Sequence, residues 1–214
     1  SDEGLGFMNV NIIKHALVDE KLTVLRNKDS DNDHFRNALN DLSLFLIYES
    51  LREIHMGRKS IQTPLAPTNG WVLDNSPLII PVVRAGLGML DAAISLLPKS
   101  AVGFLGARRD EKTFEPEVYL NTIPKNLLGS DVLILDPMLA TGGSLLHTLE
   151  IVHSAGAGNI TVVCVIASQE GITNVSASQH SGNLYLAAVD EDLNENAFIV
   201  PGLGDAGDRQ FGKM

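Results

Sequence analysis

The chain has 214 residues and a formal net charge of −10 at pH 7, from 16 basic and 26 acidic side chains. This length suits one domain with a sizeable core, and the acidic balance argues against a nucleic-acid-binding surface. No apolar run approaches the length of a membrane span. Cys164 is the only cysteine, which excludes a disulfide within the chain, and without a secretory signal pattern we expect a cytoplasmic protein.

We expect residues 1–214 to form a single domain. Residues 1–7 precede Met8 and are interpreted as a candidate addition to the native chain, so the fold prediction begins after them. Two segments, 58–77 and 108–124, are expected to leave the body of the domain as an arm and a hairpin-like excursion.

The strongest predicted helix begins near residue 33 and extends to about residue 54. Asp33 is a plausible N-cap, and apolar residues then recur at helical spacing, at Phe35, Ala38, Leu39, Leu42, Phe45, Leu46, Leu51 and Ile54. The following arm contains three prolines and the Asn69-Gly70 pair, which is typical of a hairpin turn. The arm would either contact another copy of the chain or form an ordinary surface loop.

The rest of the chain alternates apolar strands with helices. We predict strands at 78–83, 101–107, 132–135, 160–167, 184–189 and 198–200, and helices at 86–97, 144–155 and 171–180. This alternation predicts an α/β fold with a mainly parallel sheet flanked by helices. Pro81 cannot donate to a central ladder, so it indicates a bulge or a sheet edge in the first of these strands.

One strand exit has the composition of a phosphorylated-sugar site. The uniformly apolar run at 132–135 fits a strand buried on both faces, and Asp136 follows at its carboxyl end, where open α/β sheets bind ligands. Gly142 and Gly143 can take positive φ and let N–H groups approach a phosphate, while the helix that starts at Ser144 presents its positive dipole end. An ordinary β-α connection is the alternative. A P-loop is excluded because no lysine follows the glycines.

The run at 136–144 closely resembles the 5-phosphoribosyl-1-diphosphate (PRPP) loop of the type I phosphoribosyltransferases, in the form found in their uracil-specific branch. Pro137 stands where other branches usually carry a second acid. The resemblance implies a type I phosphoribosyltransferase fold with a small extended arm. It also implies that PRPP is bound by Asp136, Pro137, Met138, Leu139, Ala140, Thr141, Gly142, Gly143 and Ser144.

Two arginines belong to further motifs. Arg84 directly follows the strand at 78–83 and should lie at the same sheet edge as Asp136, where its guanidinium could bind phosphate oxygens bidentately; a surface arginine is the alternative. Arg109 lies in a charged turn that would ordinarily be an exposed loop. The resemblance implies that both arginines contact PRPP and act in catalysis on the departing diphosphate, and Arg108 departs from the aromatic residue that relatives often have.

A glycine-rich segment near the end of the chain, 202–207, matches the pattern G-x-G-x-x-G. A dinucleotide fold is rejected because only seven residues follow Gly207, too few for the required helix and later acid. The resemblance of residues 198–208 to the family's uracil-binding segment implies that uracil contacts Ile199, Gly204, Asp205 and Ala206, with Asp205 also near PRPP. Asp205 is also a catalytic candidate, because its carboxylate could accept or orient the N1 proton of uracil. Asp208 is interpreted as a turn cap.

The resemblance of these three motifs to the family implies an enzyme, a glycosyltransferase that converts uracil and PRPP to UMP and diphosphate. Because the sequence has no metal-ligand cluster, Mg²⁺ would arrive mainly on PRPP. The resemblance further implies a homo-oligomer and, in some members, activation by GTP. The alternatives are a phosphoribosyltransferase for another base, a pyrimidine-responsive RNA-binding regulator on the same fold, which the acidic balance disfavours, and a dinucleotide-binding oxidoreductase.

Overall fold

A computed structural model describes residues 7–109 and 116–213, apart from the side chains of 107–109 and 116–117. Its centre is a seven-stranded sheet in the order β1-β11-β9-β7-β4-β5-β6, in which only the β5–β6 pairing is antiparallel. The strands are β1 (Met8–Ile12), β4 (Leu78–Val83), β5 (Leu105–Arg109), β6 (Pro116–Asn121), β7 (Val132–Leu135), β9 (Ile160–Val163) and β11 (Gly182–Leu186). The predicted α/β fold with a mainly parallel sheet is confirmed.

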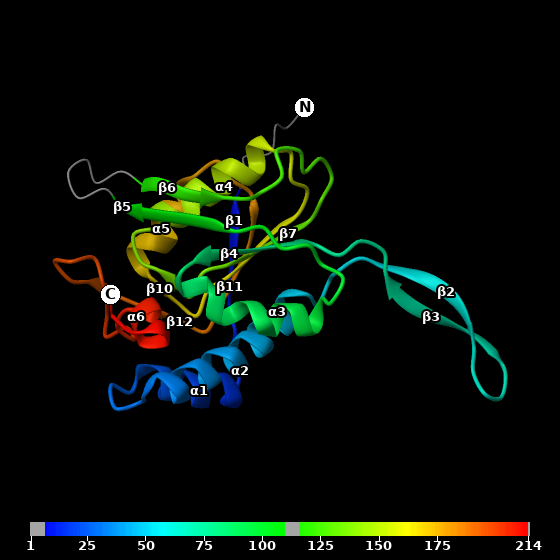
Figure 1. The fold of residues 1–214 in the computed structure, drawn as a ribbon, viewed down its shortest axis with the longest axis horizontal. Coiled ribbons are helices and arrows are strands. Elements are labelled where there is room, and N and C mark those ends of the chain that lie inside the picture. Colours follow the sequence, from blue (N-terminus) through cyan, green and yellow to red (C-terminus); the bar gives the residue numbers. More distant parts are fainter. Residues whose placement is uncertain (1–6, 110–115, 214) are drawn as a thin grey trace.

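Helices cover both faces of this sheet (Figure 1). Both faces of β7 are apolar, because Leu133 and Leu135 pack in one buried cluster while Val132 and Ile134 pack in another. Each face is therefore covered by helices. The first cluster includes helices on one face, namely α1 (Ala16–Arg26), α2 (Asn32–Ser50), η1 (Ala85–Met89), α3 (Leu90–Leu96) and α6 (Ala206–Phe211). The second is completed by α4 (Gly143–Ser154) and α5 (Gln169–Ala177). Within the described residues, no helix combines the length and the apolar character that crossing a membrane requires.

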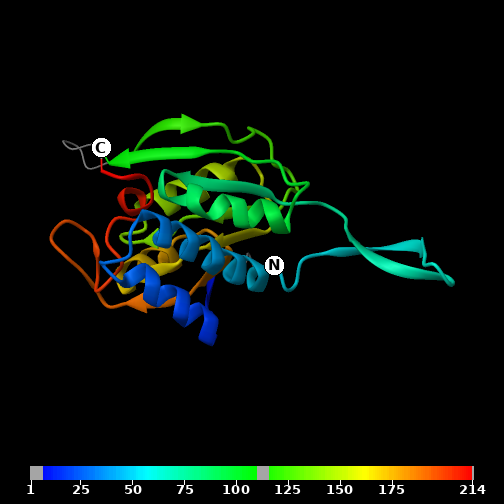
Figure 2. The ribbon, with the colours of Figure 1, turned by 60° about the horizontal axis from the view of Figure 1, so that its bottom comes forward.

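An antiparallel hairpin of β2 (Met56–Gln62) and β3 (Pro67–Leu73) projects from the body as the predicted arm (Figures 1 and 2). Its turn is not at the Asn69-Gly70 pair, because these residues pair with Ser60 and Lys59 inside the ladder. The chain reverses at residues 63–66, where the Thr63 hydroxyl accepts hydrogen bonds from the N–H groups of Leu65 and Ala66.

Several predicted boundaries were wrong. The long helix begins after Asp31, whose side chain accepts a hydrogen bond from the His34 N–H, and it ends at Ser50. The predicted helix at 86–97 is a 3₁₀ turn followed by the short α3. Elements that the apolar patterns did not reveal include β1, α1 and α6, the last of which begins inside the glycine-rich segment.

Two strands predicted as continuous are each broken into two. The chain leaves the main sheet after β9 and β11 and continues as β10 (Ile166–Ser168) and β12 (Ala188–Asp190), which form a small parallel sheet with β8 (Met138–Leu139). The break after β9 is stabilised by the Pro137 carbonyl, which accepts hydrogen bonds from two successive N–H groups, at residues 165 and 166. A further two-stranded ribbon joins β13 (Asp192–Leu193) to β14 (Ile199–Val200).

Pro81 lies on a central strand, contrary to the prediction of a bulge or an edge, since β4 is flanked by β7 and β5. The Ile79 N–H donates to the Ala101 carbonyl, so the backbone nitrogen of Pro81, two residues on, also faces the β5 side. Pairing on that side is interrupted between the Ile79–Val102 bridge and the Val82–Leu105 pair. The proline therefore occupies a gap in the ladder, where no donor is required.

Candidate functional site

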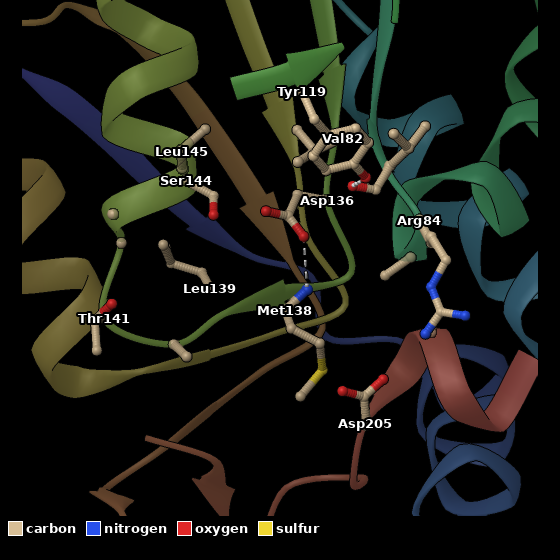
Figure 3. Close-up of a pocket in the computed structure, with 16 residues that line it drawn as sticks. Val82, Arg84, Tyr119, Asp136, Met138, Leu139, Thr141, Ser144, Leu145 and Asp205 are labelled. Atoms are coloured by element: carbon tan, nitrogen blue, oxygen red, sulfur yellow. Dashed lines mark hydrogen bonds between the residues drawn. The ribbon is translucent and has the colours of Figure 1, made fainter. Parts of the chain in front are cut away.

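A pocket of about 800 Å³ lies at the carboxyl ends of β4 and β7. It brings together side chains from segments far apart in the sequence (Figure 3). The lining residues are Val82, Val83, Arg84, Ala85, Tyr119, Asp136, Met138, Leu139, Ala140, Thr141, Gly142, Gly143, Ser144, Leu145, Asp205 and Gly207. Arg84, Asp136, the loop at 138–144 and Asp205 therefore share one cavity.

Asp136 lies at the top of β7 with only 9% of its surface exposed. Burial raises the pKa of this carboxyl to about 7, although the Met138 N–H, which donates to Oδ1 at 3.3 Å, acts in the opposite direction (Figure 3). The carboxylate, once ionised, can only accept hydrogen bonds. Donors supplied by a ligand in the pocket would therefore stabilise its charged form.

The turn after β8 leads into the N-terminus of α4. Gly142 has a φ of 91° and precedes the helix without a side-chain cap, whereas Gly143 is already the first helical residue. Of the two glycines, only Gly142 uses positive φ, and the helix begins one residue earlier than predicted. The first N–H groups of α4 have no partner within the helix, and together with the helix dipole they favour an anion at this end of the pocket.

Two carbonyl groups of the loop accept hydrogen bonds from residues of β10 and α5. The buried Ser168 hydroxyl donates to the Ala140 carbonyl at 2.5 Å and accepts from the Gly171 N–H, while the Asn174 side chain donates to the Thr141 carbonyl at 2.9 Å. A Cβ at Gly171 would lie 2.3 Å from the Ala140 oxygen, so only glycine fits there. Sequence reasoning missed these three residues; the only signal was an N-cap serine three residues before a glycine.

Arg84 reaches the pocket from the end of β4, and its Nη2 contacts Oδ1 of Asp208 at 2.9 Å. The prediction that Asp208 caps a turn was wrong. Asp205 is the N-cap of α6 and accepts a hydrogen bond from the Asp208 N–H at 2.8 Å, which leaves the Asp208 carboxylate free to pair with the arginine. The C-terminal segment thus positions the guanidinium.

Further contacts join α6 to the turn after Arg84. The buried Gln210 side chain donates to the carbonyls of Ala85 and Ala206, at 3.0 and 2.8 Å. A Cβ at Gly88 would lie 1.8 Å from the Gln210 Oε1, so a larger residue there would displace the Gln210 side chain. Residues 84–88 and the last helix therefore form one packed unit beside the pocket.

The segment before α6 is held by two arginines. Arg26 binds both carboxylate oxygens of Asp190, at 2.7 and 2.8 Å, and also donates to the Gly202 carbonyl, while Asp190 accepts from the Gly202 N–H. This pairing with Arg26 lowers the pKa of Asp190. Arg209 lies over the Phe35 ring and donates to the carbonyls of Leu25, Asn27, Ser30 and Leu203.

Four of the remaining predicted site residues do not line the pocket. Ile199 and Ala206 are each 3% exposed and pack in the core beneath it, Gly204 takes a φ of 78° in the turn before α6, and Pro137 lies in the break between β7 and β8. Arg109 ends β5, and its side chain lies outside the described residues. Among residues 7–109 and 116–213, no group of three or more His, Cys, Asp or Glu side chains could hold a metal ion.

Comparisons with known proteins agree with this arrangement. A family model described as uracil phosphoribosyltransferase matches residues 12–213. Proteins named uracil phosphoribosyltransferase from Corynebacterium efficiens and Corynebacterium glutamicum are each 46% identical over 205 residues, which is 96% of this chain and 97% of each relative.

Two solved structures share the fold of this chain. A protein from Aquifex aeolicus is similar over 95% of this chain and 98% of its own, with a TM-score of 0.88 and 35% identity. A hypoxanthine-guanine phosphoribosyltransferase from Bacillus anthracis, only 10% identical, shares the fold over 74% of this chain and 80% of its own, with a TM-score of 0.51. The chain therefore belongs to the uracil phosphoribosyltransferase family.

Proposed function

We propose that this chain transfers the phosphoribosyl group of PRPP to uracil and releases UMP and diphosphate. The observation that carries the proposal is the single pocket in which an anion-binding helix start, Asp136 and Arg84 face one another. Membership of the uracil phosphoribosyltransferase family supports the choice of base.

PRPP is proposed to lie across the pocket from α4 to Arg84. Its 5′-phosphate would accept hydrogen bonds from the first N–H groups of α4 and from the hydroxyls of Thr141 and Ser144, which all lie at one end of the cavity. The ribose hydroxyls would donate hydrogen bonds to Asp136. These bonds would stabilise the charged form of its carboxylate, which burial disfavours. The diphosphate would then point toward Arg84.

The reaction breaks the bond between ribose C1 and the diphosphate oxygen and forms a bond from C1 to uracil N1, which gives up its proton. Positive charge develops on the ribose and negative charge on the departing diphosphate. Arg84 and Arg109 are proposed to stabilise the diphosphate, and the phosphate loop holds C1 in line with N1. Asp205 is proposed to accept or orient the N1 proton, since its carboxylate borders the cavity.

Uracil presents an acceptor, donor, acceptor edge through O2, N3–H and O4. Backbone N–H and C=O groups near Ile199, Gly204 and Ala206 are proposed to match this edge, since the two side chains are buried and the glycine has none. Cytosine would leave two of these backbone groups unpaired, and unpaired buried polar groups are costly.

Mg²⁺ is proposed to arrive mainly on PRPP. Among the described residues, the pocket offers two separate carboxylates, Asp136 and Asp205. Two are too few to build an octahedral site from protein atoms, so this donor set fits an ion carried by the substrate. When bound, the ion would neutralise charge on the diphosphate. We assign no side chain as its ligand.

A homo-oligomeric state and activation by GTP are proposed on the family resemblance alone, and a cytoplasmic location on the cysteine content. Each needs its own measurement: the mass in solution, the distribution in cell fractions, and the initial rate with and without GTP.

The direct test incubates the purified chain with PRPP, Mg²⁺ and one base at a time: uracil, cytosine, orotate or hypoxanthine. The proposal predicts equimolar UMP and diphosphate with uracil and no nucleotide with the other bases. A nucleotide formed only from another base would show that the chain acts on that base instead of uracil. The absence of any product would contradict the proposed function. A salt-dependent titration with RNA tests the regulator alternative, which requires a binding signal.

A further inference from the structure

Tyr119 lines the pocket from β6, although no sequence motif singles it out. In the β5–β6 ladder Gly106 pairs with Leu120 and Ala107 pairs with Val118, so Tyr119 is an extra residue without a partner. Such a β-bulge re-aims a side chain, and bulges are frequent beside active sites. The bulge therefore accounts for how a strand at the edge of the sheet presents an aromatic side chain to the pocket.

The opposite strand leaves room for the ring. A Cβ at Gly106 would lie 2.5 Å from the Tyr119 Cε2 and 2.6 Å from its Cζ, so any larger residue at 106 would displace the ring. The bulge on β6 and the glycine on β5 thus act together to seat one side chain.

The position of the ring relates it to the two halves of the PRPP site. The Tyr119 hydroxyl donates to the Val83 carbonyl at 3.3 Å, one residue before Arg84. In Figure 3 the ring lies beside Val82 and Asp136, at the wall of the cavity. The side chain remains 51% exposed, and its surface faces solvent and the cavity.

We propose that Tyr119 is a positioning residue for PRPP, whose ring covers the ribose beside Asp136 while its hydroxyl holds the strand exit that carries Arg84. The inference rests on the proposed function. Because the single phenolic hydrogen is engaged by Val83, the oxygen can only accept, and a ribose hydroxyl is the donor that PRPP offers there. The ring also keeps water from the ribose, which strengthens the polar contacts around it.

Kinetics of two variants test this role. Tyr119→Phe keeps the ring and should raise the KM for PRPP by about 5-fold, the value of one ordinary hydrogen bond. Tyr119→Ala also removes the ring that covers the ribose. It should raise the KM for PRPP by about 30-fold, because buried apolar area is lost in addition. The KM for uracil should stay within about 2-fold in both, since Figure 3 shows the ring on the opposite side of the cavity from Asp205, the residue of the proposed base segment that lines the pocket. Tyr48→Phe on α2, which removes a hydroxyl away from this pocket, is the matched control and should match the unsubstituted chain.

A double-mutant cycle tests the seating of the ring. Gly106→Ala should displace the ring and approach the effect of Tyr119→Ala, but it should add little in the Tyr119→Ala background, because the ring it displaces is then absent. Additive effects would overturn the role of Gly106. If the melting curve shows that Gly106→Ala does not fold, the Tyr119→Phe and Tyr119→Ala variants alone test the role of Tyr119.

The two proposals fail separately. UMP formation by the unsubstituted chain is measured first, and its absence overturns the proposed function. If UMP forms but Tyr119→Ala leaves the KM for PRPP unchanged, or raises the KM values for PRPP and uracil equally, only the role of Tyr119 is overturned.

Discussion

The two halves of the pocket are built in different ways. The phosphate half is a continuous stretch from β7 through Asp136 to α4, so its binding groups are neighbours in the sequence, and Ser168 and Asn174 support the loop from outside this stretch. The half assigned to the base depends on partners far away in the sequence, such as the Arg26–Asp190 pair that holds Gly202. A local motif can therefore define where PRPP binds, whereas the base side needs the complete fold. Variants of one half should consequently affect one substrate more than the other.

Arg84→Ala is expected to have the largest effect, because Arg84 lies where the halves meet. Loss of charge stabilisation on the diphosphate should lower kcat by about 100-fold or more, the usual result of removing one donor to a developing anion. Arg84→Lys keeps the charge without the planar fork and should recover part of the rate. A purely structural Arg84 would instead give a lower melting temperature with catalysis per folded molecule intact.

Asp136→Asn should act on the phosphate half alone. The amide cannot replace a charged acceptor for the ribose hydroxyls, so the KM for PRPP should rise by about 10-fold or more while the KM for uracil changes little. An unchanged KM for PRPP in steady-state assays would remove the ribose role of Asp136.

The same substitution should stabilise the fold at alkaline pH. Burial raises the pKa of Asp136 from 3.8 to about 7, so the folded state binds this proton more tightly than the unfolded state and loses stability as pH rises between these values. A shift of this size corresponds to roughly 4 kcal/mol as an upper bound. The melting temperature of the Asn variant, relative to that of the unsubstituted chain, should therefore be higher at pH 8 than at pH 5. An equal difference at both values would contradict the buried-carboxyl account.

Arg26→Ala tests the half assigned to the base. It would leave the Asp190 carboxylate, which is 7% exposed, without its cation, at a cost of about 3 kcal/mol in the free energy of unfolding by analogy with other broken buried pairs. The KM for uracil should rise by about 10-fold, because the loosened turn at Gly202 lies on the side of the pocket assigned to the base. The KM for PRPP should rise less. Equal changes in both constants would mean that the two halves are not separable. Arg52→Ala, which breaks an exposed pair with Glu49, is the matched control.

Ser168→Ala is expected to have the smallest effect. Loss of the hydroxyl that bridges the Ala140 carbonyl and the Gly171 N–H should raise the KM for PRPP by about 5-fold, in line with about 1 kcal/mol for one hydrogen bond. The KM for uracil should not change, and Ser178→Ala at the other end of α5 provides the control. A larger effect on uracil than on PRPP would contradict the division between the halves.

The same difference explains what could be predicted from the sequence. The buried strand before Asp136 and the end of the strand before Arg84 have local sequence patterns. These patterns predicted the fold class and the position of both residues in one pocket. The position of the hairpin turn did not follow from the sequence, because the Asn69-Gly70 pair, a local turn signal, lies inside the β2–β3 ladder.

Residues whose roles depend on tertiary contacts had no such pattern. Asp208 pairs with an arginine 124 positions away, and Tyr119 reaches the pocket only through a bulge opposite Gly106. Ser168 supports the phosphate loop from a strand that the apolar pattern had merged with β9. These contacts arise from the packing of distant segments, which single-sequence patterns do not encode.

The most direct test of the two-halved pocket is a crystal structure of the chain with UMP bound. It should show the 5′-phosphate on the first N–H groups of α4, the ribose hydroxyls on Asp136 and the uracil edge against the backbone around Gly204. A phosphate bound away from residues 141–144, or a base that contacts none of residues 199–206, would contradict the account.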